Sequence, residues 1–211
     1  MALMMAGCCL MAVTARAAES PTANATGPAQ AARTPQIKRA SRPTSNTVQI
    51  GLIGKPAPEF VKIKGWSNST TITLESLRGK VVMLDFFFHK CPPCIRDMPK
   101  MMDVYERNKN QGLVVIGVHS DIVKDIPTME SFLQKNATEK WGGRAIPWPI
   151  ALDGGGVVKL EGMRMTTAGA TCAEYGVYVY PTKVLIDKKG IVREFIKSVD
   201  PEPSIQKLLK E

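Results

Sequence analysis

The chain has 211 residues, of which 44% are hydrophobic and 22% charged, and its formal net charge is +9. These proportions are typical of globular domains and exclude a wholly disordered chain, while the length allows one ordinary domain with additional segments. No apolar run reaches the roughly 18–20 residues needed to span a bilayer. The five cysteines are an odd number, so at least one of them has no partner within the chain.

The first 18 residues have the features of an export segment. Residues 2–13 form a short apolar run, and the small residues Ala15 and Ala17 stand where a signal peptidase would cleave. We therefore expect a signal peptide or a membrane or lipid anchor over residues 1–18. The location would then be extracytoplasmic, either periplasmic or anchored on the outer side of the inner membrane. Lipidation of Cys8 and a short buried helix are the alternatives to cleavage.

Residues 19–49 are rich in Ala, Pro, Thr and Ser and show no apolar periodicity. Such a segment buries too little surface to repay the entropy of ordering, so we expect a flexible linker. The first 49 residues hold five basic residues and one acidic residue, which makes the linker basic and leaves the rest of the chain only mildly so. This distribution predicts no nucleic-acid partner and allows a weak membrane tether through anionic lipid.

Residues 50–211 alternate between strand and helix patterns, which indicates an α/β fold around a mixed sheet. An extended entry segment is expected first, because Pro56 and Pro58 disfavour helix. The nearly continuous apolar run from Val81 to Phe88 predicts a central strand buried on both faces. The expected strands cover residues 70–74, 81–88, 113–118, 150–152, 179–186 and 191–196, and the expected helices cover 92–108, 126–136 and 204–210.

Cys91-Pro92-Pro93-Cys94 follows the central strand and opens a helix. Two cysteines three positions apart in a first helical turn can reach disulfide geometry. The free N–H groups at the helix start lower the pKa of the first thiol, so that one thiol attacks and the other resolves the mixed disulfide. Half of a zinc site and a structural disulfide are the alternatives. Zinc needs about four ligands and few others are available, and a loop of this size constrains little entropy.

The chain resembles the thioredoxin superfamily, and more closely its TlpA/ResA-like redoxin branch. The resemblance runs from about Ile50 to the end. It is carried by residues 53–60, 77–82, 86–94 and 97–99, and further along by 118–121, 175–177 and 180–187. It implies a three-layer α/β/α sandwich around a central mixed sheet, with an N-terminal strand extension. It also implies a redox-active disulfide, Cys91–Cys94, with no other cofactor and no metal.

The resemblance assigns roles to individual residues. Cys91 matches the exposed nucleophile and Cys94 the buried resolving thiol. Pro99 matches the proline that kinks the active-site helix, and Pro181 the cis-proline that packs against the disulfide. Asp85 lies where thioredoxins carry a buried acid, which in an apolar strand would have a raised pKa and take the proton of Cys94. A hydrogen-bonded core carboxylate is the alternative for Asp85.

Other residues near the pair have weaker assignments. Asp97 occupies the position of a glutamate in this branch, so it is either a proton shuttle or a helix-surface acid. His89 and Lys90 replace the residues that usually precede the first cysteine, and His89 is expected to contact substrate or to be a mere surface residue. Tyr180, Pro92 and Pro93 are the other expected substrate contacts.

Three further features lie outside these assignments. Cys172 is expected to be an inert buried thiol, with a regulatory or intermolecular thiol as the alternative. His119, at a strand end, is expected to be structural. Residues 122–144 form a longer connection than a minimal thioredoxin has, and they predict a substrate-facing surface or an extra helix.

The resemblance predicts a thiol–disulfide oxidoreductase of the bacterial cell envelope, acting on protein thiols and disulfides, as in cytochrome c maturation. An exported reductant would need an upstream electron donor in the envelope. A peroxiredoxin-like peroxidase is the first alternative, but it requires Thr or Ser where Phe88 stands, three residues before Cys91. A thioredoxin-like binding module is the second alternative, and the intact cysteine pair opposes it.

Overall fold

The computed structural model describes residues 47–197 and 200–211, so the predicted export segment and residues 19–46 of the predicted linker lie outside it. Helix α1 (Thr47–Leu52) begins inside the stretch expected to be linker. It also includes Gly51 and Leu52, where the sequence predicted extended chain; that part of the prediction is wrong. Pro56 lies beyond the end of this short helix and so does not oppose it. The side-chain amide of Gln49 donates to the Gly176 carbonyl at 3.1 Å and holds α1 in place.

Six strands form one mixed sheet in the order β1-β4-β3-β2-β7-β8. The central strands β2, β3 and β4 run parallel to one another, while β1, β7 and β8 are antiparallel to their neighbours. This is the mixed α/β sheet that the sequence predicted. The strands are β1 (Gly65–Ser67), β2 (Val81–Phe87), β3 (Leu113–His119), β4 (Ile150–Leu152), β7 (Thr182–Ile186) and β8 (Val192–Ile196).

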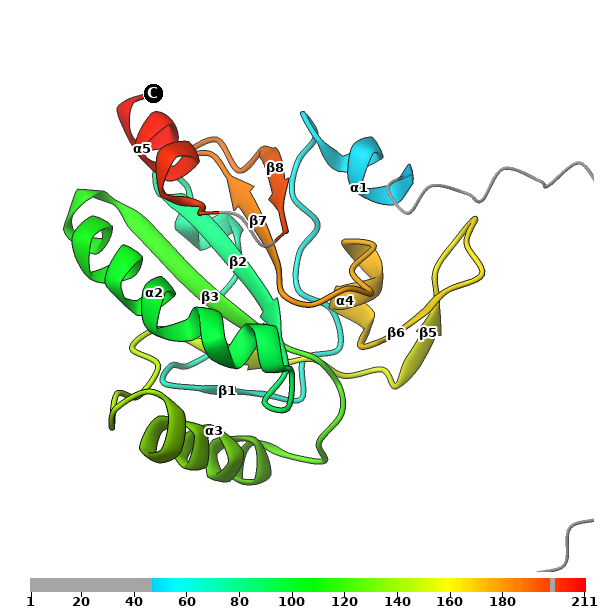
Figure 1. Ribbon diagram of the computed structural model, residues 1–211. Coiled ribbons are helices and arrows are strands. Elements are labelled where there is room, and N and C mark those ends of the chain that lie inside the picture. Colours follow the sequence, from blue (N-terminus) through cyan, green and yellow to red (C-terminus); the bar gives the residue numbers. More distant parts are fainter. Residues whose placement is uncertain (1–46, 198–199) are drawn as a thin grey trace, which may run out of the picture. The chain divides into compact units, whose positions relative to one another are not determined.

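The sheet is covered on both faces, which gives the three layers expected (Figure 1). Side chains alternate along β2, so Met83 and Phe87 face one layer while Leu84 and Phe86 face the other. The first layer holds α2 (Pro92–Asn108), α3 (Ile126–Lys140) and α5 (Glu202–Lys210). The second holds α1, α4 (Ala170–Glu174) and the chain between α1 and β2, including the short helix η1 (Glu75–Leu77).

Two strand predictions need correction. Residues 70–74 are not a strand, because the backbone N–H of Leu74 donates to the Glu59 carboxylate at 2.8 Å instead of to a neighbouring strand. The strand extension is β1, at residues 65–67. The strand expected over 179–186 begins only at Thr182. The peptide bond between Tyr180 and Pro181 is cis, and proline has no N–H for a ladder.

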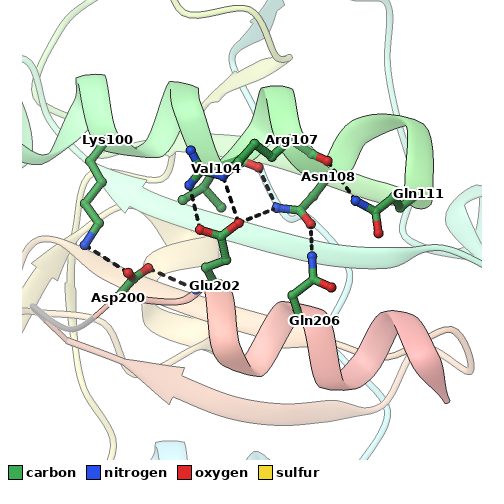
Figure 2. Close-up of polar contacts among 8 residues, drawn as sticks. All are labelled: Lys100, Val104, Arg107, Asn108, Gln111, Asp200, Glu202 and Gln206. Carbon is green, nitrogen blue, oxygen red and sulfur yellow. Dashed lines mark hydrogen bonds and ion pairs between the residues drawn. The ribbon is translucent and has the colours of Figure 1, made fainter.

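Polar contacts fix α5 against α2 (Figure 2). Arg107 donates to both carboxylate oxygens of Glu202, at 2.9 and 2.6 Å. Asn108 is buried at the end of α2. It donates to Glu202 at 3.3 Å and accepts a hydrogen bond from Gln206. Lys100 pairs with Asp200 at 3.1 Å. The short helix η2 (Lys109–Gln111) then carries the chain into β3.

A two-stranded sheet lies between β4 and α4 in the chain, and the sequence did not predict it. The loop over residues 154–156 leads into β5 (Val157–Lys159), which pairs antiparallel with β6 (Thr166–Ala168). We call this β5–β6 unit the hairpin.

Within residues 47–197 and 200–211, no helix has the length and apolar character to cross a membrane.

Candidate active site

Cys91 and Cys94 form a disulfide at the start of α2, with their Cα atoms 5.2 Å apart. Cys91 is the N-cap of the helix, and its Sγ accepts the backbone N–H of Cys94 at 3.3 Å. A thiolate at this place is stabilised by the positive end of the helix dipole. The predicted difference in exposure is absent from this oxidised form, since each cysteine is 3% exposed. The disulfide bond itself holds both sulfurs in the same buried turn.

Pro181 follows a cis peptide bond, as the family resemblance implied. The Tyr180 ring lies edge-on to Phe88, with centroids 5.2 Å apart, and this contact joins the cis-proline loop to the loop before Cys91. Cys91 N donates to the Phe88 carbonyl at 3.1 Å. The redox loop and the cis-proline loop are therefore held together at the carboxyl end of β2.

Asp85 is 2% exposed, and its Oδ1 has no hydrogen-bond partner among the described residues. It shares the face of β2 that points toward α2, with Met83 and Phe87 on either side. Burial raises the pKa of Asp85, and the nearby Lys183 ammonium opposes only part of that rise. A buried acid with a raised pKa is suited to accept or donate a proton in catalysis.

Lys183 was not predicted from the sequence as a site residue. It lies directly opposite Asp85 in the register between β2 and β7. Its side chain is 1% exposed and forms an ion pair with the one-third-exposed Asp97 of α2. Burial alone would lower the pKa of Lys183, but Asp85 and the hydrogen bond to Asp97 raise it. Asp97 is therefore the outer member of a buried charge cluster, which its position on a helix surface did not reveal.

The prediction that His89 is a surface residue is wrong, because His89 is 4% exposed. Its ring stacks on Phe132 of α3, with centroids 4.1 Å apart. Its Nδ1 lies 3.1 Å from Nε2 of the buried His119, and its backbone N–H also points to that nitrogen at 3.2 Å. Burial lowers the pKa of His89, and the neighbouring Lys90 lowers it further. Its ring therefore supports the redox loop from inside and is not open to a substrate at the surface.

His119 stands at the end of β3, where the sequence predicted a structural role. Its Nδ1 lies 2.8 Å from the Ser120 carbonyl, which can only accept, so Nδ1 carries the proton. Nε2 is then the acceptor for His89, and the proton between the rings belongs to Nδ1 of His89. Burial lowers the pKa of His119 to about 4, which keeps both rings in this neutral arrangement.

Helix α3 is the extra helix expected within residues 122–144, and it fixes the redox loop. Asp125 caps α3 by accepting the N–H of Thr128 at 2.9 Å. From this helix, Asn136 donates to the His89 carbonyl at 2.8 Å, and Trp141, just after it, donates to the Ile95 carbonyl at 2.8 Å.

The bond from Trp141 has a specific cause. In an α-helix the Ile95 carbonyl would accept from residue 99, but Pro99 has no N–H. The indole of Trp141 supplies the missing donor. Thus α3 contacts the backbone on both sides of the disulfide, before Cys91 and after Cys94.

Cys172 is a free and fully buried thiol, as the sequence predicted. Burial raises its pKa well above the ordinary range, so it is not a thiolate at neutral pH. The Tyr180 hydroxyl lies 3.5 Å from its Sγ and 3.2 Å from Oγ of Ser120. Cys172 therefore lies behind the cis-proline loop.

Within the described ranges, no three His, Cys, Asp or Glu side chains group as metal ligands.

Comparison with known proteins supports a redox assignment. Residues 53–195 match the AhpC/TSA family. The chain is 33% identical over 159 residues to the thiol-disulfide oxidoreductase ResA of Bacillus anthracis, covering 75% of this chain and 78% of ResA. It is 35% identical over 143 residues to Protein DipZ of Mycobacterium bovis, covering 65% of this chain but only 18% of DipZ.

Solved structures agree with this assignment. A thiol-disulfide isomerase from Corynebacterium glutamicum is 28% identical, with a TM-score of 0.55 over 74% of this chain and 97% of that one. A thioredoxin-like superfamily protein is 27% identical, with a TM-score of 0.57 over the same shares of the two chains.

Proposed function

Because the chain belongs to the AhpC/TSA family and is a thioredoxin-like thiol–disulfide oxidoreductase of the ResA-like branch, we propose that it reduces disulfides in proteins of the bacterial cell envelope. The observation that carries the proposal is the Cys91–Cys94 disulfide at the N-terminus of α2, beside a cis-proline loop. The described structure is then the oxidised product of one turnover.

The reaction begins from the reduced dithiol. The Cys91 thiolate attacks one sulfur of the substrate disulfide, forming a mixed disulfide and releasing one substrate thiolate, which takes a proton from solvent. Cys94 then loses its proton to the Asp85 carboxylate and attacks Sγ of Cys91. The second substrate thiolate leaves and is protonated in turn. The substrate gains two electrons and two protons, and the enzyme is left with its disulfide.

The reduced state must be restored by a thiol donor, which we place in the cell envelope. The relatives' thiol–disulfide oxidoreductase names support protein substrates of this class. Maturation of cytochrome c is one process that needs such a reductant. We further propose that Tyr180, Pro92 and Pro93 contact the substrate. Residue 180 precedes the cis bond, and Pro92 and Pro93 separate the two cysteines.

Single-cysteine variants test the mechanism. C91S should lose all reduction of a protein disulfide such as insulin, and it should form no mixed disulfide. C94S should also fail to turn over but should accumulate a mixed disulfide through Cys91, visible as an added mass that a reductant removes. Activity retained in C91S would exclude Cys91 as the nucleophile.

Redox potential tests the direction of electron flow. A potential of the Cys91–Cys94 pair at or below about −250 mV against glutathione supports a reductase, whereas a value near about −120 mV indicates an oxidant.

Peroxide consumption tests the peroxidase alternative. The aromatic side chain of Phe88 packs on Tyr180 and offers no hydroxyl to orient a peroxide, so rapid peroxide turnover would contradict the proposal.

The envelope location rests on residues 1–18. Expression of the full chain in a Gram-negative bacterium, followed by fractionation and intact mass, should give a periplasmic form cleaved after about Ala17 or a lipidated form at Cys8. A cytoplasmic product of full mass would contradict this part of the proposal.

A further inference from the structure

A groove lies between the hairpin and the redox side of the molecule. Phe88 and Tyr180 line it on the redox side, Val157 and Thr166 on the hairpin side, and Ile122 also borders it. We call it the docking groove. Its volume is about 220 Å³, several times the roughly 30 Å³ that a water molecule occupies in the liquid. It is therefore large enough for a big apolar side chain.

Two exposed apolar side chains line the docking groove, and two more adjoin its lining residues in the chain. Ile122 is 46% exposed and Val157 is 76% exposed. Met165 and Val179, each 45% exposed, are the chain neighbours of groove-lining residues. Only two other large apolar side chains of the described ranges are comparably exposed, Ile50 and Ile53. Exposed apolar side chains beside a groove are typical of interaction sites.

The groove is built before any partner arrives, because hydrogen bonds fix the hairpin at its base. Gly156 N donates to the Asp121 carboxylate at 2.7 Å, and Asp121 N donates to the Ala168 carbonyl at 3.0 Å. Ser120 Oγ donates to the same carbonyl at 2.8 Å. Thr167 Oγ1 lies 3.2 Å from the Tyr180 hydroxyl, which joins the hairpin to the cis-proline loop. A preformed site loses little entropy on binding.

A positive charge lies near the docking groove. Lys159 lies two residues from Val157 and directly opposite Thr166, so it shares a face of the hairpin with these two lining residues. Lys159 is exposed and forms no ion pair with any side chain in the described ranges. The carboxylate of Asp121, by contrast, is already paired with Lys64. An acidic group on a partner would find an unpaired cation at this end.

We propose that the docking groove binds a segment of the disulfide-bearing substrate protein, with an aliphatic or aromatic side chain in the groove and an acidic residue next to it that pairs with Lys159. The inference rests on the proposed function and narrows its substrate class. The groove borders Phe88, whose carbonyl holds Cys91 N, and Tyr180, which precedes Pro181. A segment bound there would place its cysteine close to the redox pair.

The test uses prereduced full-length protein in single turnover with two kinds of disulfide. The first is an aromatic small-molecule disulfide that is too small to fill the groove and the redox centre together. The second is a set of peptides with an internal disulfide ring flanked by Leu-Glu, Leu-Lys or Ser-Glu, placed before the first cysteine in one series and after the second in another. The variants are V157S, K159E and, as a matched control, I50S, whose exposed side chain lies away from this groove.

We expect the wild-type protein to prefer Leu-Glu peptides in one of the two series. V157S should lower the rate constant for those peptides about fivefold, since it removes a partly buried apolar contact. K159E should lower it about threefold and should favour Leu-Lys instead. I50S should match the wild type, and all four proteins should reduce the small disulfide equally.

Separate outcomes overturn separate claims. If the wild type reduces neither the small disulfide nor the peptides, the proposed function fails. If it reduces both but V157S and K159E match the wild type on every peptide, the docking inference fails and the function stands. If V157S instead abolishes a dimer in sedimentation while peptide rates stay the same, the groove binds a second copy of this chain, which also overturns the inference.

Discussion

His89 Nδ1 lies 3.1 Å from His119 Nε2, and these are the two histidines of the entire chain. The hydrogen bond that fixes the His119 proton on Nδ1 leaves Nε2 free to accept from His89. Both rings must be neutral for this arrangement, and the arrangement supports the backbone two residues before Cys91. Acid should therefore destabilise the protein through this pair.

We predict that stability falls as the pH is lowered from about 6.5 to about 4. The pKa of His119 is lowered in the folded state to about 4, so in this window the unfolded chain binds more protons than the folded one. The contribution is complete above about pH 6.5 and amounts to roughly 3 kcal/mol for the single group. Denaturant unfolding at several pH values measures it. H119Q should have a flatter profile between pH 4 and 6.5, and an unchanged slope would exclude His119 as the cause.

We predict that W141F costs more stability than W148F. Both substitutions remove a similar volume from buried indole sites, but Trp141 donates to Ile95 whereas Trp148 Nε1 has no partner in the described structure. The difference should be about 1–3 kcal/mol, the cost of an unsatisfied buried acceptor. Adding P99A to W141F restores a backbone donor at residue 99 and should recover part of that loss. Equal costs for the two tryptophans would show that the hydrogen bond contributes nothing.

We predict that D85N stabilises the folded oxidised protein at pH 7–8. Burial raises the pKa of Asp85, so the folded state binds more protons than the unfolded state above the ordinary carboxyl range, and stability is lost as pH rises through the raised pKa. A neutral amide of nearly the same shape removes that loss, so D85N should unfold at a higher denaturant concentration than the wild type. The same variant should slow resolution of the mixed disulfide. Unfolding at pH 5 provides the control, because the gain should be smaller there.

We predict that K183M is strongly destabilising, by about 3–5 kcal/mol, because it leaves buried charge without its partner. Lys183 is paired with Asp97 and lies opposite Asp85. The double variant K183M/D85N should recover much of the loss, since it removes the more buried of the two carboxylates. If the double variant is no more stable than K183M, the two residues are not coupled.

The sequence predicted the strands β2, β3, β4, β7 and β8 and the redox pair because these have local signals. The apolar run of β2 and the prolines after Cys91 act within a few residues, and the structure confirms the helix from Pro92 to Asn108. Lys183 was missed because its partners lie on other elements. The hairpin was missed because its strands have three residues each. Residues 70–74 were wrongly predicted to be a strand because their side chains alternate as in a strand. In the structure the backbone N–H of Leu74 instead donates to the carboxylate of Glu59, which is distant in sequence.

Pro99 has a mechanical consequence for the redox centre. The carbonyl it leaves without a helical donor becomes the point where Trp141 attaches, and Asn136 attaches to the loop on the other side of the disulfide. Hydrogen bonds from α3 and the residue that follows it therefore hold the redox turn at both of its ends. If a ligand displaced α3, the displacement would reach the backbone around the two sulfurs directly through these hydrogen bonds and not through the sheet.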